Sequence, residues 1–260
     1  MTDKFTAVLY PLLTFVVLVA VWKLSIVVFD VPDYILPEPL AVLRSLEVGY
    51  LGGEFWPHFL FTLRSTVTGY VLGCVLAIVI GTLLAESRLF EKCFYPYIVA
   101  MQSMPKVALA PLIVVWFGYG VLSKVVMVAL MCFFPLFVNT VVGIRQADPA
   151  LLNMMRAFSA PSWLIFYRVK LFAAAGHIFA GLQISIVLSL IGAVVAEFVA
   201  SSSGIGWLIQ SSLANFNTAQ MFAALFSLVF IGLVGTKLVQ FFHRRLVFWD
   251  KAGPNTIASE

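Results

Sequence analysis

Long apolar runs, separated by short polar segments, dominate the pattern of hydrophobic and polar residues along this chain. Each run is close to the twenty or so residues that an α-helix needs to cross a bilayer core of about 30 Å. The runs do not alternate between apolar and polar residues, as the strands of a membrane barrel would. The pattern therefore predicts an all-α integral membrane protein with six spans, at residues 5–29, 65–85, 97–117, 121–144, 172–200 and 218–242.

Composition supports a membrane protein and argues against a nucleic-acid-binding one. The chain is 62% hydrophobic and 11% charged, whereas soluble domains are nearer half apolar and a quarter charged. The net charge of +4 does not indicate nucleic acid, because the Lys and Arg residues lie mainly between the spans. We expect one transmembrane domain over residues 1–260, with a core at about 59–245 and an extra N-terminal span at 5–29.

The distribution of Lys and Arg predicts the orientation. One set of loops and ends carries Lys4, Arg88, Lys92, Arg145, Arg156, Arg168, Lys170, Lys237, Arg244, Arg245 and Lys251. The other carries Arg44, Arg64 and Lys124. Because the cationic side of a membrane protein is usually cytosolic, both termini are predicted to be cytosolic.

The polar segment at residues 148–172 is the longest interruption in the second half of the chain. Asp148 suits the N-cap of a helix, Pro149 suits its first position, and Pro161 restarts the chain. We predict a short cytosolic helix–turn–helix between spans four and five, which a soluble partner can grip. Its apolar face is formed by Met154, Met155 and Phe158.

Two spans carry small residues at four-residue spacing. They are Gly69, Gly73, Ala77 and Gly81 in span two, and Gly181, Ser185, Ser189 and Ala193 in span five. Such rows allow helices to approach closely in lipid. The row alone does not say whether it faces another helix of the same chain or the seam of a dimer.

No motif indicates catalysis. The sequence lacks a GxxxxGK[ST] phosphate loop, an HExxH zinc motif and a GxSxG elbow. Cys74, Cys93 and Cys132 suggest no external disulfide. The three histidines, among them His58, are far apart in sequence, and each is interpreted as a packed or interfacial side chain. We therefore predict no catalytic residue, metal or cofactor on this chain.

Lys106 is the notable ionisable residue inside a predicted span. It follows Pro105, which weakens the helix and frees backbone carbonyls. A cation at that depth needs a polar cavity or a partner. One interpretation is a residue of a solute pathway. The other is a structural role, either a buried pair with Glu197, near the outer end of span five, or a bond to the freed carbonyls.

Three strings resemble a known family. They are ILPEPLAVLRSL at 35–46, MPKVALAPLIVVWFGYG at 104–120 and GIGWLIQSS at 204–212. They look like the permease subunits of type I ABC importers, in the branch that serves nitrate, sulfonates, taurine and related small solutes or vitamin precursors. The resemblance runs from about residue 35 to 245.

That family carries a cytosolic signature between spans four and five: EAA, three residues, Gly, nine residues, Ile, one residue, Leu-Pro. The spacing is kept here, but the letters are mostly changed. Asn153 stands at the Glu position, Ser159 at the Gly position and Phe172 at the Pro position. The resemblance implies an ATPase-coupling helix comprising Asn153, Met154, Met155, Arg156, Ala157, Phe158, Ser159, Ala160 and Pro161.

The resemblance also implies the partners and the place of the protein. It implies a multi-pass subunit of the bacterial inner membrane, surrounded by lipid, that binds a second permease copy, two ABC ATPase subunits and an extracytoplasmic solute-binding protein. ATP and Mg would be bound by the ATPase. A translocation path is expected at Lys106, Glu197, Met104 and Ser189, and an external gate or binding-protein loop at Gly204, Gly206 and Trp207.

Two other functions stay open at this point. One is a secondary transporter driven by an ion gradient, although such folds usually show broken helices in both halves, and here Pro105 and Pro111 break only span three. The other is a structural partner in a heterodimeric permease, which the altered signature letters favour.

Overall fold

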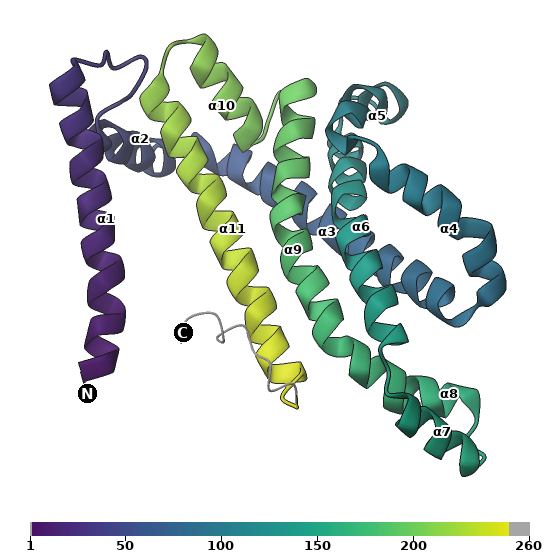
Figure 1. Ribbon diagram of the computed structural model, residues 1–260. Coiled ribbons are helices and arrows are strands. Elements are labelled where there is room, and N and C mark those ends of the chain that lie inside the picture. Colours follow the sequence, from purple (N-terminus) through teal and green to yellow (C-terminus); the bar gives the residue numbers. More distant parts are fainter. Residues whose placement is uncertain (1, 250–260) are drawn as a thin grey trace. The chain divides into compact units, whose positions relative to one another are not determined.

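The computed structural model describes residues 2–249, with side chains from residue 9, and the described residues form helices and no strand. Of the cations counted above, Lys251 lies outside this range. The helices are α1 (Thr2–Phe29), α2 (Pro39–Leu51), α3 (Phe55–Glu86), α4 (Arg88–Ser103), the 3₁₀ turn η1 (Lys106–Leu109), α5 (Ala110–Phe117), α6 (Val121–Arg145), α7 (Pro149–Ala157), α8 (Ser162–Ile165), the π-helical segment η2 (Phe166–Lys170), α9 (Leu171–Val199), α10 (Ile205–Ala214) and α11 (Thr218–Leu246) (Figure 1).

Five of the described helical segments are long and apolar enough to cross a membrane. A sixth span results if α4 and the η1–α5 segment are counted together, because that pair passes the same test although it is bent by 90°. The prediction of an all-α protein with six spans is confirmed on this count. The predicted and observed boundaries differ most at the start of α3. This helix begins at Phe55, ten residues before the predicted start at residue 65.

The third span is broken where Pro105 predicts a break, but Pro111 has another role. α4 ends at Ser103, and Pro105 is the N-cap of η1 in extended backbone. Pro111 lies in the first turn of α5. A proline there removes an N–H that has no helical partner and has the right φ for a helix. Pro111 therefore begins α5, and the expectation that it breaks a helix was wrong.

The chain divides into two compact units, which we describe in turn. The larger comprises Thr62–Ser202 and Val229–Glu260, and the smaller comprises Met1–Phe61 and Ser203–Leu228.

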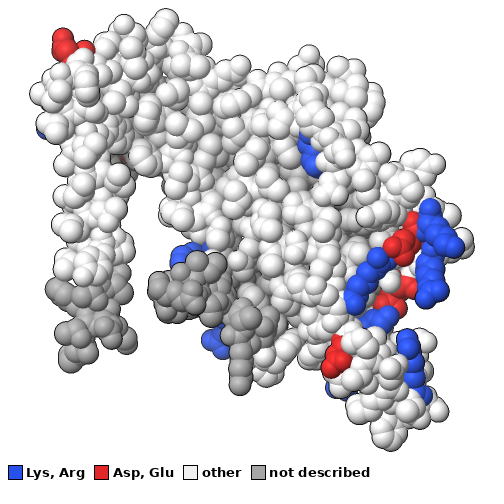
Figure 2. All heavy atoms as spheres, viewed as in Figure 1, with Lys and Arg blue, Asp and Glu red and all other residues white. Residues whose placement is uncertain are grey.

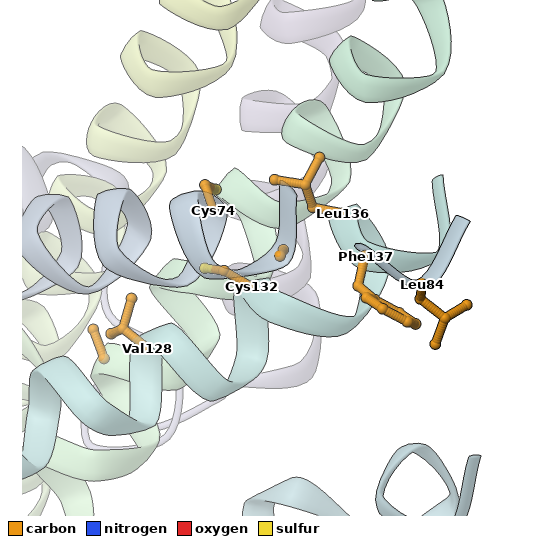
Figure 3. Packing of buried hydrophobic residues seen from close by; sticks show 8 residues of the cluster. Cys74, Leu84, Val128, Cys132, Leu136 and Phe137 are labelled. Carbon is orange, nitrogen blue, oxygen red and sulfur yellow. The ribbon is translucent and has the colours of Figure 1, made fainter. Parts of the chain in front are cut away.

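In the larger unit, α3 lies with its small residues directly against α6. A Cβ atom added at Gly73 would be 2.6 Å from the carbonyl oxygen of Ala129. One at Gly69 would be 2.5 Å from the Cβ of Val128. Cys74, Cys132, Leu136 and their neighbours fill the space beside this contact (Figure 3). The two backbones can therefore be this close only because α3 lacks side chains along this row.

α9 packs against α6 with the second row of small residues. A Cβ at Gly181 would be 3.0 Å from the Cα of Leu136. The hydroxyl of Ser185 donates to the Cys132 carbonyl at 2.9 Å, and the Cys132 thiol donates to the Ser185 carbonyl at 3.4 Å. Both rows thus pack inside one chain, which settles the choice between intramolecular packing and a dimer seam for these residues.

The smaller unit is held by aromatic and hydroxyl contacts between α2, the first turns of α3 and the start of α11. The Tyr50 ring lies edge-on to Phe55 at 5.3 Å, and its hydroxyl donates to Ser227 Oγ at 2.8 Å. α1 joins this unit through Trp22, whose ring is 5.7 Å from that of Phe222. α2 contains most of the ILPEPLAVLRSL string at residues 35–46.

The contact between α3 and α6 generates a test. Gly73→Ala is expected to lower the free energy of unfolding by roughly 1–3 kcal/mol, because the methyl group must push the backbone of Ala129 away. This loss should exceed the gain of about 1 kcal/mol in helix propensity. Thermal unfolding of the detergent-purified protein measures it.

The matched control is Gly120→Ala, which adds the same methyl where no atom lies within 4 Å. Its stability should stay within about 1 kcal/mol of the unaltered chain, since Gly120 is the N-cap of α6, where alanine is somewhat less favourable than glycine. If Gly73→Ala proves as stable as Gly120→Ala, the close contact is not what holds these helices together.

Candidate functional site

α7 and α8 form the predicted helix–turn–helix, which we call the α7–α8 hairpin (residues 148–165). The Asp148 carboxylate accepts a hydrogen bond from the Ala150 N–H at 2.8 Å, and Pro149 is the first helical residue. Both features match the sequence prediction. The large apolar side chains of the hairpin are exposed, by 48% at Met154, 79% at Phe158 and 64% at Trp163. The hairpin therefore presents an apolar face.

Ser159 sits where the backbone favours glycine. Its φ is +55°, a left-handed value that places Cβ too close to the carbonyl oxygen in L-residues. The Ser159 N–H donates to the Arg156 carbonyl and the Ala160 N–H donates to the Met155 carbonyl. This is the Schellman arrangement that ends a helix, with Ser159 in the position that glycine usually occupies. The family signature therefore has glycine at this position because the turn requires a left-handed backbone conformation.

Two ion pairs fasten the end of the larger unit that bears the hairpin. The Lys170 ammonium lies 2.6 Å from the Glu86 carboxylate, which links η2 to the end of α3. The Arg145 guanidinium lies 2.8 Å from the Glu91 carboxylate, which links α6 to α4. Figure 2 shows Lys, Arg, Asp and Glu gathered at this end, over the start of α4 and over the hairpin. Such a charged end belongs in water rather than in lipid.

The second arm of the hairpin continues into the membrane span without a break. α8, η2 and α9 together form one helical segment, Ser162–Val199. The segment η2 is π-helical, and the Leu171 N–H donates to the Phe166 carbonyl. Wide turns of this kind occur frequently at functional sites. A force applied to the hairpin is therefore applied directly to α9.

Lys106 and Met104 lie at the bend of the third span. The Lys106 ammonium donates to the Gln102 carbonyl at 3.3 Å and lies 4.6 Å above the ring of Phe134. The side chain is half-buried, and Met104 is 48% exposed. The contacts of Lys106 in this structure are therefore not those of a buried pair with Glu197 but include a bond to a carbonyl just before the break, which was the other structural alternative.

Glu197 is instead part of a fully buried polar cluster formed by α3, α6 and α9. Thr62 donates to the Glu197 carboxylate at 2.8 Å. The cation of this cluster is Lys124, whose side chain, like that of Glu197, is fully buried. The Lys124 ammonium donates to the Tyr119 carbonyl at 2.7 Å and to the carbonyl of Ala200, the C-cap of α9. A cation at a helix C-terminus is favourable.

Lys124 corrects the sequence analysis. It was counted as a charge of an external loop, but it lies in the first turn of α6, and none of its surface is exposed. Only three residues separate α5 from α6, at 118–120, so no loop exists that can carry the ammonium into water. A very short link between two apolar runs was the signal for this placement. Ser189 is also fully buried, so in this structure neither Glu197 nor Ser189 presents a surface to a solute.

The predicted external loop leads into α10 in the smaller unit. Gly204 has φ +109° and is the N-cap of α10, and Gly206 is buried in its first turn. The Gly204 N–H donates to His58 Nδ1 at 3.2 Å. The His58 ring stacks on Trp207 with centroids 5.0 Å apart. Sequence reasoning missed His58, because no motif linked it to this loop.

Comparison with known proteins defines the family. Residues 69–248 match the family of binding-protein-dependent transport system inner membrane components, and the chain belongs to this family. It is therefore an ABC importer permease, a transport protein rather than an enzyme, of a family of the inner membrane.

Three relatives cover most of both chains. The formylaminopyrimidine transport permease protein ThiX of Halalkalibacterium halodurans is 31% identical, over 94% of this chain and 96% of its own. The riboflavin transport system permease protein RibX of Chloroflexus aurantiacus is 35% identical, over 91% and 88%. The Bacillus subtilis protein named for aliphatic sulfonates transport, SsuC, is 30% identical, over 90% and 84%.

The buried cluster generates a second test. Lys124→Met is expected to lower the free energy of unfolding by about 3–5 kcal/mol, because it removes the cation from a buried cluster that also contains the Glu197 carboxylate. The double variant Lys124→Met with Glu197→Gln should lose less than the two single variants together. Thermal unfolding in detergent reports all three.

Lys106→Met is the matched control, since that ammonium is half-buried and bonded to one carbonyl. Its stability should stay within roughly 0.5 kcal/mol of the unaltered chain. Equal stability of Lys124→Met and Lys106→Met would contradict the account of the cluster.

Proposed function

We propose that this chain forms the translocation path of an importer that moves a small anionic or heterocyclic solute into the cell. The solute is delivered by an extracytoplasmic binding protein, and two ABC ATPase subunits supply the energy. The observation that carries this proposal is the α7–α8 hairpin, with its exposed apolar face and its continuous connection to α9.

The hairpin suits a coupling element on physical grounds. An exposed face of Met154, Phe158 and Trp163 matches a helix-in-groove contact with a soluble subunit. Met side chains adapt to such a groove because they are flexible and polarisable. Closure of the ATPase dimer would move the hairpin as a rigid body, and the ion pair of Lys170 with Glu86 carries the motion to α3.

ATP and Mg belong to the ATPase in this proposal, and this chain hydrolyses nothing itself. Two copies of the chain surround the path. The hairpin lies in the cytosol, as the distribution of Lys and Arg favours, and the start of α10 lies on the external side. The N- and C-termini are then both cytosolic, in a bacterial inner membrane.

Two observations support the proposed class of solute: the position of the Lys106 ammonium and the names of the relatives. Lys106 is half-buried at the bend of the third span, where its ammonium is available to an anion. The relatives are named for aliphatic sulfonates, which are anionic, and for riboflavin and formylaminopyrimidine, which are heterocyclic. A small anion or heterocycle is the class that fits both.

The direct test is binding of candidate solutes by the partner solute-binding protein, followed by uptake into proteoliposomes that contain the complete complex. An alkanesulfonate, riboflavin and formylaminopyrimidine form the first set. ATP-dependent uptake of one of them is expected. Uptake that persists without ATP but collapses with an uncoupler would contradict the proposal and favour an ion-driven transporter.

The hairpin generates a third prediction. Phe158→Asp should release the ATPase subunits, because it places a carboxylate in an apolar contact, while the permease stays folded since this side chain is 79% exposed. Co-purification with a tagged ATPase measures it. Phe158→Leu, which keeps an apolar side chain, is the control and should retain the ATPase. If Phe158→Asp holds the ATPase at full stoichiometry, the interface lies elsewhere.

Lys106 generates a fourth prediction. Lys106→Met should assemble normally with its partners but lose most ATP-dependent uptake of the solute that the binding protein binds, because the path loses its cation. Lys106→Arg, which keeps the charge, should retain uptake in large part. Normal uptake by Lys106→Met in a well-assembled complex would show that Lys106 is not part of the path.

A further inference from the structure

His58 joins two segments of the smaller unit that are far apart in sequence. It lies in the first turns of α3, and its Nδ1 accepts the Gly204 N–H at 3.2 Å. Its ring stacks on Trp207 of α10, with centroids 5.0 Å apart and an angle of 19° between the planes. One side chain therefore fixes both the N-cap of α10 and an aromatic residue of its first turn.

The hydrogen bond requires one protonation state. An imidazole nitrogen accepts a hydrogen bond only when it carries no proton, so His58 is neutral here, with its proton on Nε2. Protonation of Nδ1 would turn the acceptor into a donor that opposes the Gly204 N–H. It would also place a positive charge beside the N-terminus of α10, where the helix dipole already favours anions over cations.

The surroundings leave this titration to His58. Glu54, one turn earlier in the sequence, is the ionisable residue next to His58 along the chain, and its carboxylate accepts a hydrogen bond from the Gln220 amide at 3.3 Å. α10 contributes none, because IGWLIQSSLA contains no Asp, Glu, Lys, Arg or His. The segment Ser203–Gly204 adds only serine and glycine. His58 also holds an unusual backbone conformation, since Gly204 has φ +109°, a value that other residues rarely adopt.

We propose that His58 is a pH-sensitive latch, which holds the start of α10 when the imidazole is neutral and releases it when the imidazole is protonated. The latch is closed above the pH range in which histidine titrates and open below it. Its orientation rests on the proposed function: with α10 on the external side, the latch senses external acid and releases the loop that would receive the solute.

The test observes the Gly204 amide directly and does not depend on transport. The chain contains one Ser-Gly pair, Ser203–Gly204. Labelling serine carbonyls with ¹³C and glycine amides with ¹⁵N therefore gives a single carbonyl-filtered amide signal in the full-length protein in nanodiscs. On acidification this signal should shift as the hydrogen bond is lost, with the same midpoint as the His58 ring signals.

Two variants separate the latch from general effects of acid. His58→Asn keeps an acceptor oxygen near the position of Nδ1 but does not titrate, so its Gly204 signal should stay constant over the same pH range. His58→Phe keeps the stacked ring without an acceptor, and at neutral pH its signal should match the acidified unaltered protein. If His58→Phe does not fold, the comparison with His58→Asn alone decides.

A Gly204 signal that stays constant in the unaltered chain, or that shifts equally in His58→Asn, overturns the latch. Uptake through the complete complex is measured separately. Failure of ATP-dependent uptake at every pH would count against the proposed function, whereas the amide titration would still decide the latch.

Discussion

The direct backbone contact of α6 with α3 and with α9 is the constraint on which the larger unit depends. In lipid, apolar side chains gain little by leaving their surroundings, so helices associate through close packing and hydrogen bonds. Gly73 and Gly181 bring the two neighbours close enough for these short-range forces to act. α6 is thereby the central helix, and the positions of the bend, the buried cluster and the hairpin all follow from its neighbours.

Polar contacts close this three-helix packing at both ends. At one end, Thr62, Lys124 and Glu197 join α3, α6 and α9 away from water. At the other, the ion pair of Glu86 with Lys170 joins α3 to the segment that continues into α9. Buried charges favour specificity over stability, since wrong pairings leave a charge exposed to lipid. The three helices are therefore expected to move together when the hairpin is moved.

The sequence predicted most of the fold because the relevant signals are local. The apolar runs, the Asp148 cap and the break at Pro105 depend on neighbouring residues only. The caps and Pro161 predicted the α7–α8 hairpin, and the family resemblance added the expectation that it couples to an ATPase, although Ser159 replaces the glycine of the signature. The φ of +55° at Ser159 explains why that letter is usually glycine and shows that the turn forms without it.

The parts that sequence reasoning missed depend on which helices meet. Glu197 was paired with Lys106 as one alternative, because both lie within apolar runs. The packing of α6 against α9 instead brings Lys124 to the end of α9, where its ammonium donates to the Ala200 carbonyl. Likewise, nothing near His58 in the sequence points to Gly204, because 146 residues separate them.

The central claim is that α3, α6 and α9 form one rigid body that the hairpin moves. Spin labels at Val71 on α3 and Val187 on α9 suit this test, because both side chains are about half exposed, at 54% and 51%. In the proposed assembly of two copies, distances within one doubly labelled copy are measured without nucleotide and with ATP bound. They are compared with distances between two singly labelled copies. The account predicts that ATP changes the distance between copies and leaves the distance within a copy unchanged. A change within the copy as large as that between copies would contradict it.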